Sequence, residues 1–222
     1  KNTLIEILFQ ANIQNPKVFE TGGYEIETHL TFPRNWGLGT SSTLINNIAQ
    51  WLEIDAFELL RKSFGGSGYD VACAQTDTPI IYHLENEKPF FKKVNFNPTF
   101  KENIYFVYLN QKQSSSAAIA NYLAKHHHVD KTIAKISNIT NEALTINEGR
   151  DFALLMEKHQ AIMSDVLETE TVKEKLFPDL KGVVKSLGAW GGDFVMAISK
   201  DNPKDYFKEK GYPVVLSYEE MI

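Results

Sequence analysis

The sequence predicts an α+β protein, and two features of the chain support this fold class. The first half alternates strand-like and helical segments. The second half opens with a long helical block and closes on a strand, a glycine-rich turn, a strand, a short helix and a final strand. Helices followed by closely spaced strands are typical of domains in which helices pack on an antiparallel sheet. With 222 residues and 43% hydrophobic content, the chain can bury one large core or two small ones.

Composition excludes several classes of function. The net charge is −5 and the chain has no block of basic residues, so neither nucleic acid nor a membrane surface is an expected partner. No apolar run approaches the roughly 20 residues that cross a bilayer, and we expect a cytoplasmic protein. The single cysteine, Cys73, excludes an internal disulfide and a thiolate metal cluster.

Apolar spacing predicts the elements of the first half. Residues 4 to 13 have helical spacing, and Pro16 disfavours helical geometry in the residue before it. Residues 24 to 32 alternate apolar and polar side chains, which is typical of a half-buried antiparallel strand. Residues 79 to 84 predict another strand. Residues 104 to 109 form a nearly continuous apolar run, which predicts a strand buried on both faces.

The second half is predicted to be mainly helical before its final strands. Phe152 and Leu155 belong to the clearest helical pattern. The expected elements are helices at 115 to 125, 130 to 145 and 148 to 168, strands at 182 to 187 and 194 to 199, a short helix after Pro203, and a strand at 214 to 216.

The first glycine turn, residues 37 to 43, predicts a phosphate site. It reads Gly-Leu-Gly-Thr-Ser-Ser-Thr and runs into an apolar helical stretch that ends near Leu52. Glycines let the backbone approach a ligand closely, and the first N–H groups of a helix favour an anion. Ser41 is the expected hydroxyl ligand of a metal, and Thr40 or Ser42 the expected helix cap. An ordinary helix N-cap explains the same residues without any ligand.

Two further glycine turns follow. The second, residues 65 to 70, reads Gly-Gly-Ser-Gly-Tyr-Asp and places Asp70 at the start of a short apolar helix, where an aspartate can simply be a cap. The third, residues 188 to 193, reads Gly-Ala-Trp-Gly-Gly-Asp between two apolar strands. A hairpin turn alone would account for it.

Together the three turns resemble, in order and content, the signature of the GHMP kinases, the small-molecule kinases named for galactose, homoserine, mevalonate and phosphomevalonate. The first turn resembles their Gly-Leu-Gly-Ser-Ser-Ala phosphate loop, and the third resembles their Gly-Ala-Gly-Gly-Gly-Asp motif. Residues 66 to 72 resemble the segment that carries the catalytic aspartate. Residues 112 to 116, Lys-Gln-Ser-Ser-Ser, resemble a Gly-Lys-x-Ala-Ser-Thr segment. The resemblance covers residues 24 to 200, and the second and third turns favour phosphomevalonate kinase.

The resemblance implies a ribosomal-S5-like N-terminal domain, here residues 1 to 110, and a ferredoxin-like C-terminal domain, residues 111 to 222. It implies ATP and Mg²⁺, with Asp70 as the catalytic residue. The residues expected on the nucleotide phosphates are Gly37, Leu38, Gly39, Thr40, Ser41 and Ser42, with Ser41 also on the metal. Those expected at the acceptor are Ser67, Gly68, Lys112, Ser115, Lys185, Gly191, Gly192 and Asp193, and Arg34 is a further candidate cation.

The chain also departs from the family pattern. The first motif of the family, with its lysine near the phosphates, has no counterpart, and the sequence begins at Lys1. We therefore expect that an N-terminal portion is missing. Trp190 replaces a glycine of the third motif, where it would either narrow the substrate site or pack against the turn.

The expected activity is phosphorylation of phosphomevalonate in isoprenoid biosynthesis. The alternatives are a mevalonate kinase, for which the acceptor is an alcohol, and a non-catalytic metabolite binder with the same fold. The expected partners are a small molecule and ATP. The oligomeric state stays open, with a homodimer among the options.

Overall fold

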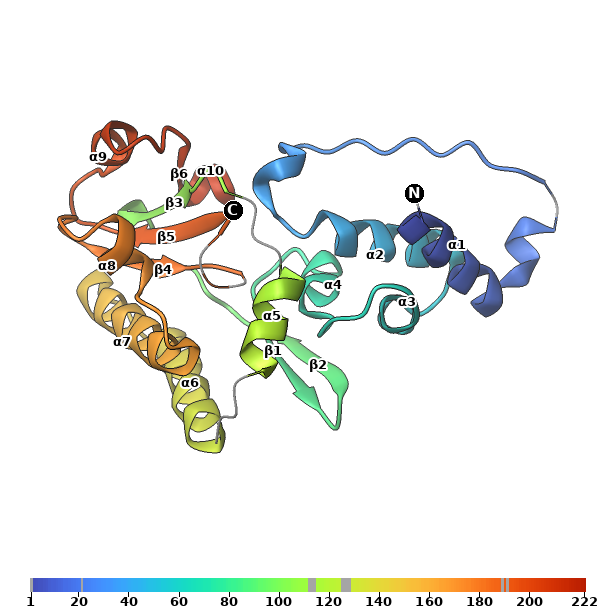
Figure 1. The fold of residues 1–222 in the computed structure, drawn as a ribbon, viewed down its shortest axis with the longest axis horizontal. Coiled ribbons are helices and arrows are strands. Elements are labelled where there is room, and N and C mark those ends of the chain that lie inside the picture. Colours follow the sequence, from blue (N-terminus) through green and yellow to red (C-terminus); the bar gives the residue numbers. More distant parts are fainter. Residues whose placement is uncertain (1, 21, 112–114, 125–128, 189, 191) are drawn as a thin grey trace. The chain divides into compact units, whose positions relative to one another are not determined.

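The computed structural model describes every residue except 1, 21, 112–114, 125–128, 189 and 191. The chain forms two compact units (Figure 1). Unit 1 comprises Lys1–Arg34 and Leu38–Phe96, and unit 2 comprises Asn35–Gly37 and Asn97–Ile222. The division into domains at residues 110 and 111 stays a prediction, because these units describe packing alone.

Unit 1 is built from helices and one β-hairpin. Its elements are α1 (Asn2–Gln14), the 3-10 helix η1 (Pro16–Phe19), α2 (Thr40–Leu52), α3 (Ala56–Ser63), α4 (Tyr69–Ala74), β1 (Ile80–Glu85) and β2 (Lys88–Lys93). A second 3-10 helix, η2 (Arg34–Trp36), lies where the chain passes from unit 1 to unit 2. Helices α1 to α4 share one buried core, to which each contributes apolar residues such as Ala11, Ile45, Leu59 and Val71.

Local sequence signals set the helix boundaries in unit 1. Helix α1 ends before Pro16, as expected. Helix α3 begins after Asp55, whose Oδ1 accepts hydrogen bonds from the backbone N–H groups of Phe57 at 2.7 Å and Glu58 at 3.0 Å. The aspartate therefore satisfies two of the amides that the first turn of a helix leaves unpaired.

The strand expected at residues 24 to 32 is wrong. Residues 22–30 are extended but have no regular secondary structure, and no strand pairs with them in the described part of the chain. Their apolar side chains are correspondingly exposed, with Tyr24 at 50%, Ile26 at 55% and Leu30 at 48%. Figure 1 shows the segment as a long blue connection before α2. The alternation of apolar and polar side chains is compatible with a strand. A strand forms, however, only when a neighbouring strand pairs with its backbone N–H and C=O groups.

Unit 2 is an antiparallel sheet with helices. Its elements are η3 (Lys101–Asn103), β3 (Ile104–Tyr108), α5 (Ser115–Leu123), α6 (Asp130–Ala143), α7 (Gly149–Leu167), α8 (Val172–Leu176), β4 (Val183–Ser186), β5 (Phe194–Ile198), α9 (Lys204–Glu209), β6 (Val215–Ser217) and α10 (Tyr218–Met221). Among the described residues the strand order is β4-β5-β3-β6, and each neighbouring pair is antiparallel. This β-α-β-β-α-β arrangement is ferredoxin-like, as expected.

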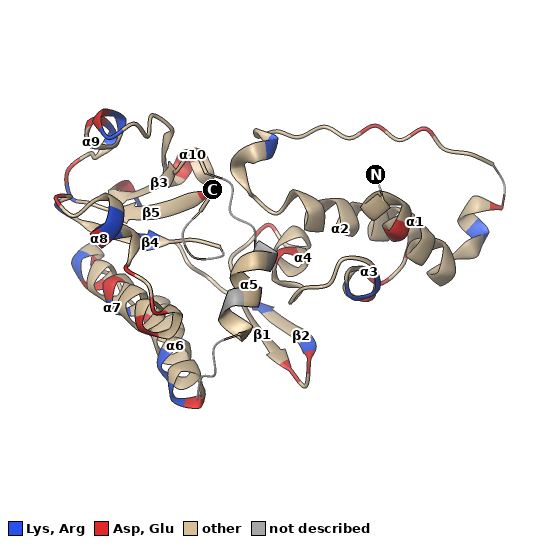
Figure 2. Cartoon of the chain, viewed as in Figure 1, with Lys and Arg blue, Asp and Glu red and all other residues tan. Residues whose placement is uncertain are grey.

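The central strand β3 is buried along its whole length, as the apolar run predicted. Val107 pairs with Val195 of β5 and with Val215 of β6. These residues join Phe177 and Phe207, both fully buried, in the main core cluster of the unit. Figure 2 shows acidic and basic residues mixed along α7 and α9.

Candidate functional site

Helix α2 begins directly after Gly39, which has a left-handed conformation with φ 68° and ψ 24°. Thr40 is already the first helical residue, so the expectation that Thr40 or Ser42 caps the helix is wrong: no side chain caps it in the described structure. The first backbone hydrogen bond runs from Thr43 N–H to the Gly39 carbonyl at 3.0 Å. The amides of Thr40, Ser41 and Ser42 therefore have no partner within the helix.

The start of α2 fits an anion. The described first turn contains no acidic residue, and the partial positive charge of a helix N-terminus favours an anion. Ser41 is exposed, whereas Ser42 is buried with 9% of its surface exposed. Of these two expected hydroxyl ligands, only Ser41 is therefore available to a metal or a phosphate.

Asp70, the expected catalytic residue, lies beside this turn within unit 1. A Cβ built on Gly39 would be 3.5 Å from both Cβ and Cγ of Asp70, and 3.8 Å from its Oδ2. Helices α2 and α4 keep Gly39 and Asp70 close together because both helices pack into the core of unit 1. In addition, Asn46 Nδ2 of α2 donates to the Ala74 carbonyl of α4 at 3.3 Å.

The surroundings of Asp70 favour a base. Desolvation by the surrounding protein raises the pKa of its carboxyl group, although the residue as a whole remains exposed. Desolvation raises the pKa because the charged carboxylate loses contact with water and becomes less stable than the neutral acid. A carboxylate with a raised pKa accepts a proton more readily than an ordinary surface aspartate.

The second glycine turn is held by the β-hairpin and by α3. Gly68 has a φ of 83°, and a Cβ built on it would lie 3.0 Å from Cδ1 of Phe57 and 3.5 Å from Cγ of Pro89. The backbone conformation therefore favours glycine here, and a Cβ would also crowd the Phe57 ring. The Tyr82 hydroxyl donates to the carbonyl of Ser67, whose own side chain is exposed.

Asp193 of the third glycine turn contacts Gly37, and both residues belong to unit 2. The Asp193 N–H donates to the Gln111 carbonyl at 2.8 Å, and the Asp193 carbonyl accepts from Leu109 N–H at 2.7 Å. These bonds fix the backbone of Asp193, and its carboxylate lies directly against Gly37. A Cβ built on Gly37 would be closer than 3.0 Å to that carboxylate, so any larger residue would collide with it.

Residues next to Gly37 are held by the ends of two strands of unit 2. The Tyr108 hydroxyl donates to the Asn35 carbonyl at 3.0 Å and accepts from Asn35 Nδ2 at 3.1 Å. The Trp36 ring packs edge-on against Phe194, with ring centroids 5.4 Å apart. Tyr108 and Phe194 are themselves neighbours at 5.3 Å.

Lys185 lies on β4 and is partly buried. Burial lowers the pKa of its ammonium group to about 8. Its Nζ donates to the Ser186 carbonyl at 3.2 Å. Burial, together with the charge of Lys185, also lowers the pKa of His159 on α7, to about 4. Lys185 is therefore a poorer candidate for binding a charged acceptor than an exposed cation would be.

The other expected acceptor residues are only partly placed. Lys112 and Gly191 lie outside the described residues. Ser115 is the first residue of α5, and Gly192 is buried. Trp190 has a φ of 59° and packs against Tyr122 of α5, with ring centroids 5.8 Å apart. The indole therefore packs onto a helix of its own unit.

Two features are absent from the described residues. No three His, Cys, Asp or Glu side chains there are grouped so as to hold a metal ion. None of the helices there is both long and apolar enough to cross a membrane.

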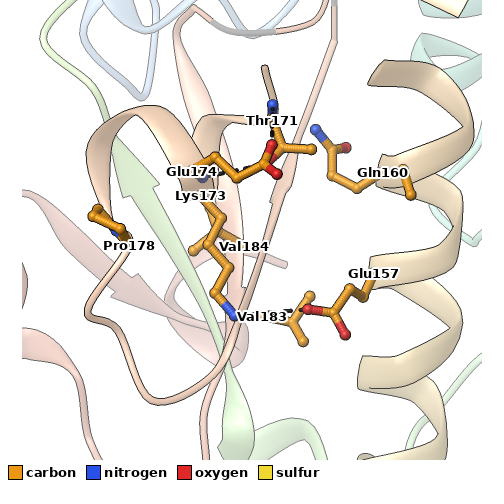
Figure 3. A pocket seen from close by; sticks show the side chains of 9 residues that line it. Glu157, Gln160, Thr171, Lys173, Glu174, Pro178, Val183 and Val184 are labelled. Carbon is orange, nitrogen blue, oxygen red and sulfur yellow. Dashed lines mark hydrogen bonds and ion pairs between the residues drawn. The ribbon is translucent and has the colours of Figure 1, made fainter. Parts of the chain in front are cut away.

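A cavity of about 300 Å³ in unit 2 lies elsewhere, beside α7, α8 and β4 (Figure 3). Val183 and Val184 line it, and Lys173 faces Glu157 across it with Nζ 3.7 Å from Oε1. Gln160 also lines the cavity and hydrogen-bonds Ser186 through its amide. None of the described residues of the three glycine turns lines this cavity.

Sequence reasoning missed the hydrogen bonds between Tyr108 and Asn35. One signal was available: a tyrosine within a wholly buried apolar strand needs a partner for its hydroxyl. Nothing in the sequence around Asn35 indicates that it is this partner, because the two residues are 73 positions apart.

Comparison with known proteins shows the fold. No family model matches the chain, and no curated protein matches its sequence. A mevalonate kinase crystal structure has a TM-score of 0.58 at 20% identity over 82% of this chain, and the chain spans 63% of that protein. The Methanococcus jannaschii mevalonate kinase has a TM-score of 0.59 at 20% identity over 92% of this chain and 76% of its own.

A third similar structure is the Lin0012 protein from Listeria innocua, with a TM-score of 0.64 at 16% identity over 99% of this chain and 75% of its own. Identities this low establish architecture alone. The chain has the α+β fold of the GHMP kinases.

Proposed function

We propose that the protein is an ATP-dependent small-molecule kinase of the GHMP superfamily. The observation that carries this proposal is the position of Asp70 beside Gly39, at the start of α2. This places a carboxylate next to a helix N-terminus that favours phosphate. The fold supports the proposal, because two of the similar solved structures are mevalonate kinases.

In the proposed reaction, the amides of Thr40, Ser41 and Ser42 bind phosphate oxygens of ATP. Asp70 orients the acceptor and takes its proton as the acceptor oxygen bonds to the γ-phosphorus. The bond between that phosphorus and the bridging oxygen breaks, and ADP leaves with the electron pair. The chain thus contributes mainly positioning and electrostatic stabilisation, as phosphoryl transfer requires.

The residues present also fit Mg²⁺ bound with ATP. Mg²⁺ usually takes one or two protein oxygens and fills its other positions with phosphate oxygens and water, so it needs no cluster of three side chains. The exposed hydroxyl of Ser41 is the expected protein ligand. When bound, the ion would spread the negative charge of the phosphates.

The proposed acceptor is phosphomevalonate, which would yield a diphosphate ester. The Gly-Ser-Gly-aromatic-Asp form of the second turn and Asp193 at the end of the third turn support this choice. A phosphorylated acceptor needs cations, and Arg34 is exposed. Mevalonate is the second candidate, because two of the similar solved structures are mevalonate kinases.

The test is ATP-dependent phosphate transfer by the complete protein, with phosphomevalonate and mevalonate offered separately. We expect turnover of phosphomevalonate, and a loss of roughly 100-fold or more in kcat for Asp70→Asn, because the amide cannot accept the proton. The matched control is Asp77→Asn, since Asp77 lies in the same unit and makes only a 3.7 Å surface pair with Lys93.

The outcomes separate the alternatives. Turnover of mevalonate alone would make mevalonate the acceptor. ATP binding without turnover of either acceptor would favour a metabolite binder or a different acceptor. Equal activity of Asp70→Asn and Asp77→Asn would show that Asp70 has no catalytic role.

A further inference from the structure

One tyrosine of the β-hairpin in unit 1 contacts the second glycine turn. The hydroxyl of Tyr82, on β1, donates to the Ser67 carbonyl, and the Tyr82 ring packs edge-on against Tyr69 with ring centroids 5.6 Å apart. The two contacts lie on either side of Gly68, the residue directly before α4. We call them together the Tyr82 clamp. All of its residues belong to unit 1, as does Asp70.

The hairpin is itself fixed on the core of unit 1. Tyr82 pairs with Phe91 of β2, and the Phe91 ring packs against Phe57 of α3 with ring centroids 6.1 Å apart. Phe57 packs against the core cluster of the unit, and a Cβ built on Gly68 would be 3.0 Å from the Phe57 ring. Tyr82 is half-buried. Its hydroxyl is therefore presented to the turn from a position with little freedom.

The glycine-rich segment before α4 makes few packing contacts of its own in the described structure. Gly65 and Gly66 both have positive φ, and a Cβ built on either meets no described atom within 4 Å. Helix α4 has only six residues, and no described side chain caps its start. Val71 packs in the core, whereas Ser67 and Tyr69 are exposed. Because so short a helix is not stable by itself, its start depends on contacts such as the Tyr82 clamp.

Asp70 follows Tyr69 directly, so the direction of its side chain depends on how the start of α4 is held. Its approach to α2 is close, since a Cβ built on Gly39 would be 3.5 Å from Cγ of Asp70. A turn rich in glycine allows the carboxylate several directions, and a catalytic base works in only one of them. A misplacement of about 1 Å is enough to slow a reaction markedly.

We propose that Tyr82 is a positioning residue for Asp70: its hydroxyl holds Ser67 so that the Asp70 carboxylate stays beside Gly39. This inference rests on the proposed kinase function. Tyr82 touches neither ATP nor the acceptor and acts through the backbone of the second glycine turn. Its contribution is to the chemical step rather than to ATP affinity, because the proposed phosphate-binding amides belong to α2 and lie outside the clamp.

The test compares Tyr82→Phe with Tyr24→Phe in the complete protein. Tyr82→Phe keeps the ring and its packing but removes the hydrogen bond to Ser67. Tyr24→Phe is the matched control, because the Tyr24 hydroxyl also donates to a backbone carbonyl within unit 1, that of Val18 at 2.8 Å, outside both glycine turns of that unit. Tyr82→Leu removes the ring contact with Tyr69 as well, and we expect it to lose more activity than Tyr82→Phe.

Two measurements are needed. The first is kcat and the KM for MgATP, with the acceptor that the native protein phosphorylates. We expect kcat to fall about tenfold in Tyr82→Phe while the KM for MgATP stays within about twofold. The second is hydrogen exchange of the Ala72 amide without ligand, because this amide donates to the Gly68 carbonyl at 2.9 Å and makes the first hydrogen bond of α4. We expect several-fold faster exchange in Tyr82→Phe than in Tyr24→Phe.

The outcomes distinguish this inference from the proposed function. If the native protein is active and Tyr82→Phe keeps its kcat, or loses no more than Tyr24→Phe, the inference is wrong. A rise in the KM for MgATP with kcat unchanged would also overturn it, as would unchanged Ala72 exchange whether or not the protein is active. If the native protein phosphorylates neither acceptor but Ala72 exchange accelerates in Tyr82→Phe, the Tyr82 clamp stands and the kinase proposal fails.

Discussion

Replacement of Gly37 by alanine tests the contact between Gly37 and Asp193 within unit 2. Gly37 has a φ of 69°, and a Cβ at this position would overlap the carboxylate of Asp193. The substitution therefore combines two costs, a left-handed conformation and a collision. Gly188→Ala is the matched control in the same unit, because Gly188 has a φ of 58° and a Cβ built on it meets no described atom within 4 Å.

The two costs can be estimated separately. Placing alanine in a left-handed conformation costs about 1 kcal/mol relative to glycine. Moving the Asp193 side chain out of its rotamer, or shifting the backbone beside it, adds about 1–2 kcal/mol. The backbone of Asp193 cannot easily relieve the overlap, because hydrogen bonds to Leu109 and Gln111 hold it. We therefore expect Gly37→Ala to lose about 2–3 kcal/mol and Gly188→Ala about 1 kcal/mol.

Urea unfolding at 25 °C measures the difference. Trp36, the residue before Gly37, packs on Phe194 and makes tryptophan fluorescence a suitable signal. With a slope of about 2 kcal/mol per molar urea, the Gly37→Ala midpoint should fall by about 1 M and the Gly188→Ala midpoint by about 0.5 M. In a double-mutant cycle, Asp193→Gly should recover about 1–2 kcal/mol of the Gly37→Ala loss, because it removes the colliding carboxylate.

Equal midpoints for Gly37→Ala and Gly188→Ala would refute this reasoning. So would a cycle in which the effects of Gly37→Ala and Asp193→Gly simply add, since the overlap would then contribute nothing.

Two further predictions concern stability. Desolvation and the charge of Lys185 lower the pKa of His159 from 6.5 to about 4, so between these pH values the unfolded chain holds a proton that the folded protein excludes. Stability should therefore fall by about 2 kcal/mol as the pH drops through this window, after allowance for the half-buried ring, and His159→Gln should flatten the dependence. Urea midpoints at pH 7, 5 and 4 measure this, and an unchanged slope in the variant would assign the effect to other groups. Asp55→Ala removes the acceptor for two backbone amides at the start of α3 and should lower the free energy of unfolding by about 1 kcal/mol. The exposed Asp77→Ala serves as its control, and equal losses would contradict a capping role.

Much of the secondary structure could be predicted from the sequence because its causes are local. Pro16 ends α1, Asp55 caps α3, and an unbroken apolar run gives the buried strand β3. Several glycines of the three turns, Gly37, Gly39, Gly68 and Gly188 among them, likewise mark places where the backbone takes positive φ. Residues 24 to 32 show the limit: the alternation is real, but the described structure holds no partner strand for it.

The sequence by itself determined which residue types are available for the candidate site, namely glycines and hydroxyls before a helix and an aspartate after a second glycine turn. Only the tertiary structure decided which of them meet. Asp70 lies beside Gly39 because α2 and α4 share a core, and Asp193 lies against Gly37 because β3 and β5 pair in a fixed register. Tyr108 reaches Asn35 for the same reason. Such contacts join residues far apart in the chain, and they arise from packing and strand pairing that no local pattern specifies.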